Sequence, residues 1–221
     1  MVALSQYDFD FYKKIGVDES KISIIPPGVY DIFFEKDIPK LDLKGDPILL
    51  SVGVLSWIKN QKMIINAMPN LLKNKPNIHL YLIGPDGGEE KNLLKISNEL
   101  GINEHVLFLG KKTPDVICRY IKTANLLLQT SYAEGLSTVL LESLVSGLPF
   151  VTTNAGGNGT LAQESNIVGF DEYGEFSKII KNLLNKKGKI ESIKNDEKTI
   201  SGYSWDDIFN RIITVYLGLA R

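Results

Sequence analysis

Two glutamates, Glu134 and Glu142, stand eight positions apart in a stretch that reads as apolar strand, small-residue loop and apolar helix. We expect the strand at Asn125–Gln129 and the loop at Gly135–Thr138. The first turn of a helix after such a loop presents backbone N–H groups without intrahelical partners, and such groups bind anions. A carboxylate nearby can accept hydrogen bonds from both hydroxyls of a vicinal diol such as ribose. The pattern therefore predicts a site for a ligand that carries both phosphate and hydroxyl groups.

The helix that carries Glu142 has sequence signals at both ends. Ser137 or Thr138 is expected to cap its N-terminus, and Gly147 is expected to end it. Glu134 then lies in the loop before the cap, and Glu142 lies about one turn inside the helix. An ordinary helix with acidic residues favoured by its dipole fits the same spacing, so the two glutamates alone do not define a function.

The composition is that of a soluble globular protein with a core of normal size. The 221 residues are 43% hydrophobic and 23% charged, and the net charge of −1 predicts no nucleic-acid partner. The single cysteine, Cys118, excludes an internal disulfide and fits a reducing compartment. No apolar run has transmembrane length, and the N-terminus lacks the pattern of a signal peptide, so we predict a cytoplasmic protein. His79 and His105 are too few and too far apart to predict a metal site.

From residue 47 onward, strand and helix patterns alternate, which predicts an α/β fold with a doubly wound, Rossmann-like parallel sheet. The expected strands are Ile48–Val52, Ile78–Ile83, Val106–Leu109, Asn125–Gln129 and Pro149–Thr153. The expected helices are Gln61–Lys73, Glu89–Leu100, Thr113–Thr123, Glu175–Lys187 and Trp205–Leu219. Pro69 should kink or restart the first of these helices, and Thr113 and Ser204 should cap the third and the last.

The segment from Glu134 to Gly157 resembles the signature of the retaining, nucleotide-sugar-dependent glycosyltransferases of the group 1 family. That family has Glu, seven residues, Glu, a helix, a short Val-rich strand and a Gly-Gly loop, and the match runs without a gap. The resemblance implies the two-domain GT-B architecture, of which this chain would be the C-terminal half.

The resemblance also implies roles for individual residues. Glu134 would lie near the donor sugar and Glu142 would hold the ribose. The backbone amides of the segment between them would bind the diphosphate, namely Gly135, Leu136, Ser137, Thr138 and Val139. In the same family two cations in a Gly-Arg…Lys loop neutralise the diphosphate. Lys59 matches the lysine of that loop after Gly53, whereas Val54 stands in the arginine position.

Three further loops follow predicted strands and would line the same crevice, because ligands of doubly wound sheets bind at the carboxyl ends of the strands. Gly84 begins a Gly-rich turn that resembles the turn where the family's nucleotide approaches the backbone. Gly110 and Lys111 match the segment where the family's base lies. The loop Asn154–Thr160 lacks the acidic residue that often follows the family's Gly-Gly pair, so we assign it only close backbone packing near the donor.

We expect three parts along the chain. Residues 1–35 resemble the tail end of a first domain and the interdomain linker, residues 36–203 the Rossmann-like donor-binding domain, and residues 204–221 a helix that packs toward the domain boundary. The rest of the first domain is a missing N-terminal domain, through which the protein would make peripheral contact with a membrane surface. The first segment and the last helix should expose an apolar patch.

The leading hypothesis is a group 1 family retaining glycosyltransferase that moves a sugar from a UDP- or GDP-linked donor to an acceptor hydroxyl. The resemblance implies no metal and no cofactor apart from the nucleotide-sugar substrate, and it leaves the acceptor open among a glycan, a lipid and a small molecule. A non-catalytic module that binds a nucleotide or a sugar nucleotide is the alternative, which Val54 and the missing domain allow. A nucleotide-sugar epimerase of the same architecture is a weaker alternative, because the complete Glu-x7-Glu helix with its Gly-Gly loop speaks against it.

Overall fold

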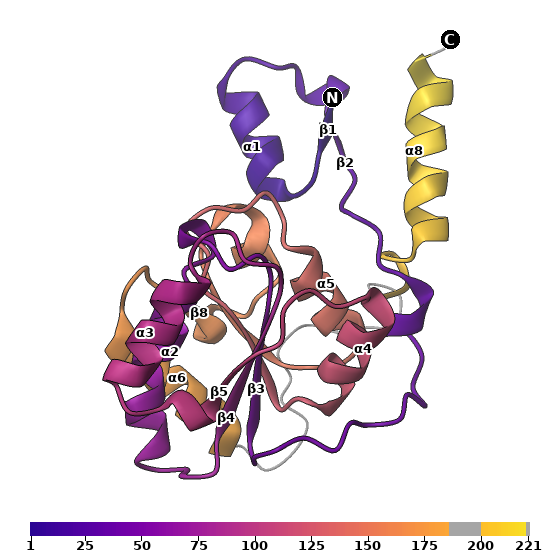
Figure 1. The fold of residues 1–221 in the computed structure, drawn as a ribbon. Helices are drawn as coiled ribbons and strands as arrows, with labels where there is room; N and C mark the ends of the chain where they lie inside the picture. The colour runs from indigo at the N-terminus through magenta and orange to yellow at the C-terminus, as the bar shows by residue number, and fades with distance from the viewer. Residues whose placement is uncertain (186–199, 220–221) are drawn as a thin grey trace.

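A six-stranded parallel sheet forms the centre of the protein in the computed structural model, which describes residues 1–185 and 200–219 (Figure 1). The order across the sheet is β5-β4-β3-β6-β7-β8. The strands are β3 Ile48–Val52, β4 His79–Ile83, β5 Val106–Phe108, β6 Leu126–Gln129, β7 Phe150–Thr153 and β8 Ile167–Val168. The predicted doubly wound α/β fold is confirmed, and five of the strands were expected from sequence.

Helices cover both faces of this sheet. On one face lie α2 Gln61–Leu72, α3 Glu90–Glu99 and α6 Tyr173–Asn185, and on the other lie α4 Pro114–Thr123 and α5 Thr138–Val145 (Figure 1). The predicted end of the fourth helix at Lys187 lies outside the described residues. Short 3-10 helices fill several connections: η1 Glu19–Lys21, η2 Asp31–Phe33, η3 Trp57–Lys59, η4 Asn103–His105, η5 Gly156–Thr160 and η6 Glu164–Asn166.

The side-chain alternation of the strands divides the core into two clusters. In β3, Leu49 packs with the α2, α3 and α6 side, and Leu50 packs with the α4 and α5 side. Both leucines are fully buried. Because the central strands are covered on both faces, their sequences are nearly continuous runs of apolar residues.

Some local expectations were wrong. The strand β8 was not predicted, because two residues are too short to show a pattern. Pro69 does not restart its helix, because α2 continues from Gln61 to Leu72 through the proline, and the alternative of a kink there stays a prediction. Thr113 occupies the N-cap position of α4, but its side chain makes no capping hydrogen bond. The prediction for Ser204 is confirmed, since its hydroxyl accepts a hydrogen bond from the Asp207 amide at 3.2 Å.

The two ends of the chain lie together beyond the sheet. Strands β1 Val2–Ala3 and β2 Ser23–Ile24 pair in parallel, with helix α1 Gln6–Lys14 between them in sequence (Figure 1). Helix α8, Trp205–Leu219, stands beside β2, and the Arg211 guanidinium donates to the Ile24 carbonyl. The division of the chain at residues 35 and 203 remains a prediction.

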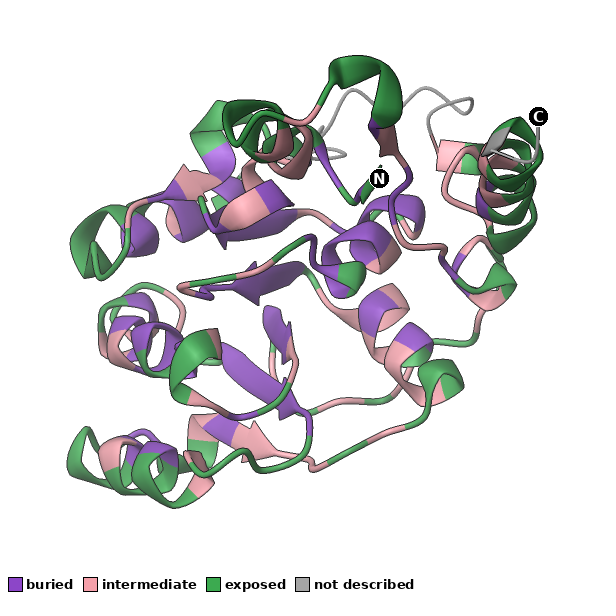
Figure 2. Cartoon of the chain, turned by 90° about the horizontal axis from the view of Figure 1, so that it is seen from above, coloured by how far each residue is buried: buried purple, intermediate pink, exposed green. Residues whose placement is uncertain are grey.

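Both α1 and α8 expose large apolar side chains, as the sequence predicted. In α1 these include Phe11, with Ile15 directly after the helix, and in α8 they include Phe209 and Tyr216. Figure 2 shows α8 as mostly exposed, and its best buried apolar residue is Ile208. These two helices therefore contribute little to the core of the sheet domain.

The chain reverses its direction across the sheet between β3 and β6. From β3 it proceeds outward to β4 and β5, and then returns to β6 and proceeds the other way to β7 and β8. The loops after β3 and β6 therefore lead to helices on opposite faces of the sheet, α2 and α5. Open α/β sheets bind their ligands at such a topological switch point.

Candidate ligand-binding site

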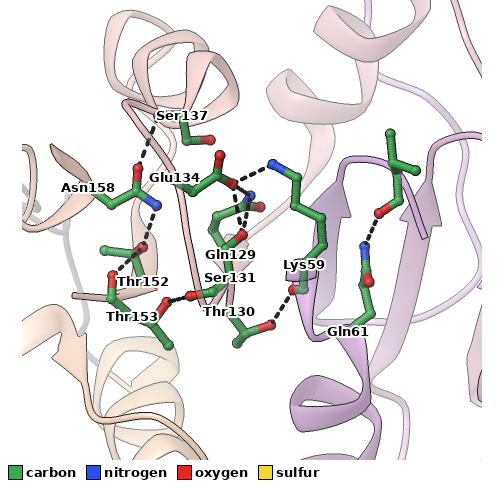
Figure 3. Close-up of polar contacts among 11 residues, drawn as sticks. Lys59, Gln61, Gln129, Thr130, Ser131, Glu134, Ser137, Thr152, Thr153 and Asn158 are labelled. Carbon is green, nitrogen blue, oxygen red and sulfur yellow. Dashed lines mark hydrogen bonds and ion pairs between the residues drawn. The ribbon is translucent and has the colours of Figure 1, made fainter. Parts of the chain in front are cut away.

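An ion pair between Lys59 and Glu134 bridges the switch point (Figure 3). Lys59 lies in η3, in the loop after β3, and Glu134 lies in the loop after β6. Their side chains are 24% and 12% exposed, so the pair is partly shielded from solvent but reachable from it. Two residues 75 positions apart in sequence thus meet at the switch point, where open α/β sheets bind their ligands.

The orientation of the Glu134 carboxylate is fixed by two further donors. The Gln129 amide donates to Glu134 Oε1 at 3.0 Å, and the Ser131 hydroxyl donates to the same oxygen at 2.8 Å. Gln129 and Ser131 are both buried. Three donors on one oxygen hold the side chain in a single arrangement, as a carboxylate that positions a ligand requires.

Hydrogen bonds to backbone carbonyls hold together the three loops that follow β3, β6 and β7. The Thr130 hydroxyl donates to the Asn60 carbonyl at 2.9 Å, and the Tyr132 amide donates to the Ile58 carbonyl at 2.7 Å. On the other side, the Thr153 hydroxyl donates to the Ser131 carbonyl at 2.6 Å. These contacts connect the carboxyl ends of β3, β6 and β7 into one rigid rim.

The N-terminus of α5 is capped by Asn158, which corrects the expectation for Ser137 and Thr138. Ser137 is the N-cap residue, but its side chain makes no capping hydrogen bond. Its backbone amide instead donates to Asn158 Oδ1 at 3.0 Å (Figure 3). Asn158 is fully buried, so its role exceeds the backbone packing that the sequence suggested.

Two backbone amides at the start of α5 are unpaired within the described residues. The Thr138 and Val139 N–H groups have no acceptor in the part of the chain that the structure describes. Thr138 is exposed, whereas Val139 is packed against the core. Free amides at a helix N-terminus are a ready anion site.

Two glycines let the loop after β7 support the loop that carries Glu134. Gly156 has a φ of 54°, and a Cβ atom there would lie 1.8 Å from the Glu134 carbonyl oxygen. The Gly157 amide donates to the Gly135 carbonyl at 2.7 Å, and a Cβ on Gly157 would lie 2.6 Å from that oxygen. Any other residue type at these two positions would displace Glu134.

Glu142 lies on α5 away from the ion pair, in a half-buried place on the side of α4. Within the described residues its carboxylate has no hydrogen-bond or ion-pair partner. Burial raises the pKa of Glu142 to about 7. A partly buried carboxyl without a partner is costly to the empty protein, and perturbed groups of this kind gather at ligand sites.

The other predicted residues lie in the loops after β3, β4 and β5, along the carboxyl edge of the sheet. Gly84 packs directly on the loop after β3, because a Cβ on it would lie 1.9 Å from the Gly53 carbonyl oxygen. The Gly84 amide donates to the Gly110 carbonyl at 3.0 Å, so the ends of β3, β4 and β5 adjoin in a row. Lys111 and Val54 are exposed at this rim, and neither contacts Lys59 or Glu134.

Sequence reasoning missed Gln129, Ser131 and Asn158. The sequence could have indicated the first two residues. Gln-Thr-Ser directly follows three leucines at the end of a predicted strand, and the carboxyl ends of such strands form the ligand-binding edge of the sheet. Asn158 gave no such signal, since its place in a Gly-rich loop is typical of an ordinary turn.

The described residues hold neither a metal cluster nor a membrane-spanning helix. No group of three or more His, Cys, Asp or Glu side chains among them is placed to hold a metal ion. Likewise, no helix in residues 1–185 and 200–219 is long and apolar enough to cross a membrane.

Comparisons with known proteins identify the family of the chain. The family model of the group 1 glycosyl transferases matches residues 33–199. Spore coat protein SA of Bacillus subtilis is 27% identical over 189 residues, which cover 80% of this chain and 50% of that protein. D-inositol 3-phosphate glycosyltransferase of Nocardia farcinica is 27% identical over 161 residues, which cover 67% of this chain and 36% of that protein. The chain thus spans half or less of the length of these curated relatives.

Solved structures share the fold at low identity. Anabaena Alr3699/HepE in complex with UDP and glucose has a TM-score of 0.81 and 22% identity, covering 99% of this chain and 62% of that one. Sucrose-phosphate synthase from Thermosynechococcus elongatus has a TM-score of 0.82 and 20% identity, covering 99% of this chain and 57% of that one. The sheet and its helices therefore match those of GT-B glycosyltransferases.

The pKa of Glu142 predicts a pH-dependent stability. Because the pKa rises from an ordinary 4.5 to about 7 on folding, the folded protein is favoured below pH 4.5 and loses this stability as the pH rises toward 7. The loss above pH 7 is on the order of 3 kcal/mol. Glu142→Gln, which stays neutral, should therefore raise Tm by roughly 5–10 °C at pH 8 and hardly at pH 4.5, measured by calorimetry. Glu104→Gln, an exposed glutamate, is the matched control, and an equal gain at both pH values would refute the interpretation.

Proposed function

Because the chain belongs to the group 1 glycosyltransferases, we propose that it binds a nucleoside-diphosphate sugar and supplies the donor half of a retaining sugar transfer. The observation that carries the proposal is the Lys59–Glu134 pair at the switch point, beside the start of α5 with its two unpaired amides (Figure 3). A cation and free helix amides suit a diphosphate, and a fixed carboxylate suits the hydroxyls of a sugar. That UDP and glucose are bound in the Anabaena structure of the same fold supports this assignment.

In the proposed complex each residue has one task. The Thr138 and Val139 amides and the Lys59 ammonium bind the diphosphate, and Glu134 accepts hydrogen bonds from the donor sugar. Glu142, which has no partner in the described chain, receives the ribose hydroxyls. The nucleoside is bordered by the rim residues Gly53, Gly84, Gly110 and Lys111.

In the proposed transfer, one bond of the donor sugar breaks and one forms. The bond between the anomeric carbon and the diphosphate oxygen breaks, and its electron pair stays with the diphosphate. The acceptor oxygen bonds to the anomeric carbon from the same face, and the acceptor hydroxyl passes its proton to the departing diphosphate oxygen. Lys59 and the α5 amides stabilise the negative charge that grows on the departing diphosphate, and such fixed charges and dipoles are usually the main source of an enzyme's rate acceleration. No residue is assigned as a nucleophile, and no metal is required in this proposal.

A non-catalytic binding module is the second candidate, and Val54 is the observation that favours it. Val54 is exposed at the rim where the resembled family has an arginine, so the diphosphate would meet one cation from this loop instead of two. Fewer charges would weaken the stabilisation of the leaving group more than the binding of the nucleoside.

The direct test of the donor site is a thermal-shift series with UDP, GDP and their sugar conjugates. A ligand at about 100 times its Kd should add roughly 2.7 kcal/mol to the free energy of unfolding and raise Tm. We expect this gain to persist in EDTA. A shift that appears only with Mg²⁺, or no shift with any nucleoside diphosphate, would contradict the proposal.

Substitutions should separate the roles of the two glutamates. Glu142→Ala should weaken binding of the free nucleoside diphosphate by about ten- to a hundredfold, because hydrogen bonds to a charged group contribute roughly 1.5–3 kcal/mol. Glu134→Ala should leave free diphosphate binding nearly intact and weaken binding of the sugar-bearing donor. Isothermal titration of each variant with UDP and with UDP-sugar measures both effects, with Glu104→Ala as control. Equal weakening of free UDP by both variants would refute this division.

Acceptor transfer tests the proposal that the chain supplies the donor half alone. Acceptor recognition would belong mainly to a further domain, in keeping with the greater length of the relatives. We therefore expect the 221-residue chain to bind donor and to transfer no sugar to an acceptor, although slow donor hydrolysis is compatible with the site. The measurement is a radiolabelled-donor assay with an acceptor panel, run with this chain alone and with a separately expressed N-terminal half. Robust transfer by the chain alone would overturn the expectation.

A further inference from the structure

A second pocket opens beside the donor crevice, between η3 and the first turns of α2 and α3. Its volume is about 230 Å³, and its lining includes Trp57, Tyr132, Asn60, Gln61, Glu89 and Asn92. At about 30 Å³ per water molecule this volume corresponds to roughly eight waters. That is room for one small ring and less than the pockets that hold drug-sized ligands provide.

One side of this pocket is aromatic. The rings of Trp57 and Tyr132 lie 6.4 Å apart, and the Phe170 ring follows 5.7 Å beyond Tyr132. Trp57 is 68% exposed, which is unusual for so large an apolar surface in a folded domain. The Tyr132 hydroxyl donates to Asp171 at 2.8 Å, which fixes that ring. Rigid aromatic rings offer a large contact area at a low cost in conformational entropy.

The other side of the pocket is lined by side-chain amides and a carboxylate, which are planar polar groups. The Asn92 amide donates to Glu89 at 2.9 Å, and the Gln61 amide donates to the Val54 carbonyl at 2.9 Å. Gln61 is only 3% exposed, and its Oε1 atom has no hydrogen-bond partner in the described residues. Carboxylates and side-chain amides suit hydroxyl groups, which both donate and accept hydrogen bonds.

The charged side chains that line the pocket are of both signs, namely Glu89 and the exposed Lys62. Glu89 lies in its wall, and Asp171 lies behind Tyr132. At the start of α3, the Asp86 carboxylate accepts hydrogen bonds from the Gly88 amide at 2.8 Å and from the Glu90 amide at 3.0 Å. A phosphate in this pocket would be repelled by the Glu89 carboxylate as well as attracted by the Lys62 ammonium. A neutral ring that bears hydroxyls has no such conflict.

We propose that this pocket binds one neutral pyranose, stacked on Trp57 and hydrogen-bonded to the Glu89–Asn92 wall. Trp57 precedes Lys59 by two residues, and Tyr132 precedes Glu134 by two, so the pocket adjoins the donor crevice but is lined by different side chains. The proposal of a sugar-binding site depends only on the pocket. The identification of its natural occupant as a sugar unit of a saccharide acceptor rests on the proposed function.

The test is saturation-transfer NMR of the full chain with methyl glycosides of glucose, galactose, mannose and N-acetylglucosamine. At least one should bind saturably, and UDP should not displace it. Trp57→Ala should weaken this binding about tenfold, and Asn92→Ala severalfold. Tyr216→Ala is the matched control, since Tyr216 is also 68% exposed but lies on α8, and it should change nothing.

Three outcomes would overturn the proposal. The first is no binding of any glycoside at tens of millimolar. The second is binding that UDP-sugar or Glu134→Ala abolishes and Trp57→Ala leaves intact, which would locate the sugar in the donor crevice. The third is Trp57-dependent binding of uridine or inorganic phosphate without binding of the glycosides. Trp57-dependent glycoside binding by a chain that shows no thermal shift with UDP or GDP would refute the donor proposal and leave this one standing.

Discussion

The contact on which the candidate site depends is the ion pair between Lys59 and Glu134 across the switch point of the sheet. The topology separates the loops after β3 and β6, and this pair, with the hydrogen bonds beneath it, joins them again. Exposed ion pairs contribute little to stability, because solvent screens them. This pair is mostly shielded and is reinforced by Gln129 and Ser131, so its main effect is to fix the geometry of the crevice.

The rim around this pair is built from side chains that hydrogen-bond to the backbone of neighbouring loops. Thr130 and Thr153 donate to carbonyls of those loops, and Asn158 holds the first turn of α5. All three are buried. A buried hydroxyl or amide without a partner would cost about 1–3 kcal/mol, so each of these contacts allows only one arrangement of the loops. The rigidity of the site thus comes from polar residues, whereas the stability of the domain comes from the two apolar clusters.

Much of the architecture was predictable because it follows from local patterns. The apolar run at β3 and the helical stripe of α2 are each readable within a dozen residues. The alternation of such segments then predicts a parallel sheet. The missed strand β8 has two residues and shows no period.

The site was only partly predictable, since its contacts join distant parts of the chain. The sequence resemblance indicated both Lys59 and Glu134, but not that they pair. The cap of α5 came from Asn158, 21 residues beyond the amide that it accepts from, rather than from the serine at the cap position. Local rules name the residue types that cap a helix, and only the fold decides which loop reaches its end.

In the proposed complex, the half-buried carboxyl of Glu142 would also connect ligand binding to the exchange of protons with the buffer. With a pKa near 7 it is about half protonated in the empty protein at neutral pH. Hydroxyl groups that donate to it favour its ionised form, so a ligand that supplies them expels a fraction of a proton. The heat measured for such a ligand would then include the ionisation heat of the buffer, and would differ between phosphate and Tris at the same pH. If Glu142 receives the ribose as proposed, its carboxyl is a stronger acid in the complex than in the empty chain.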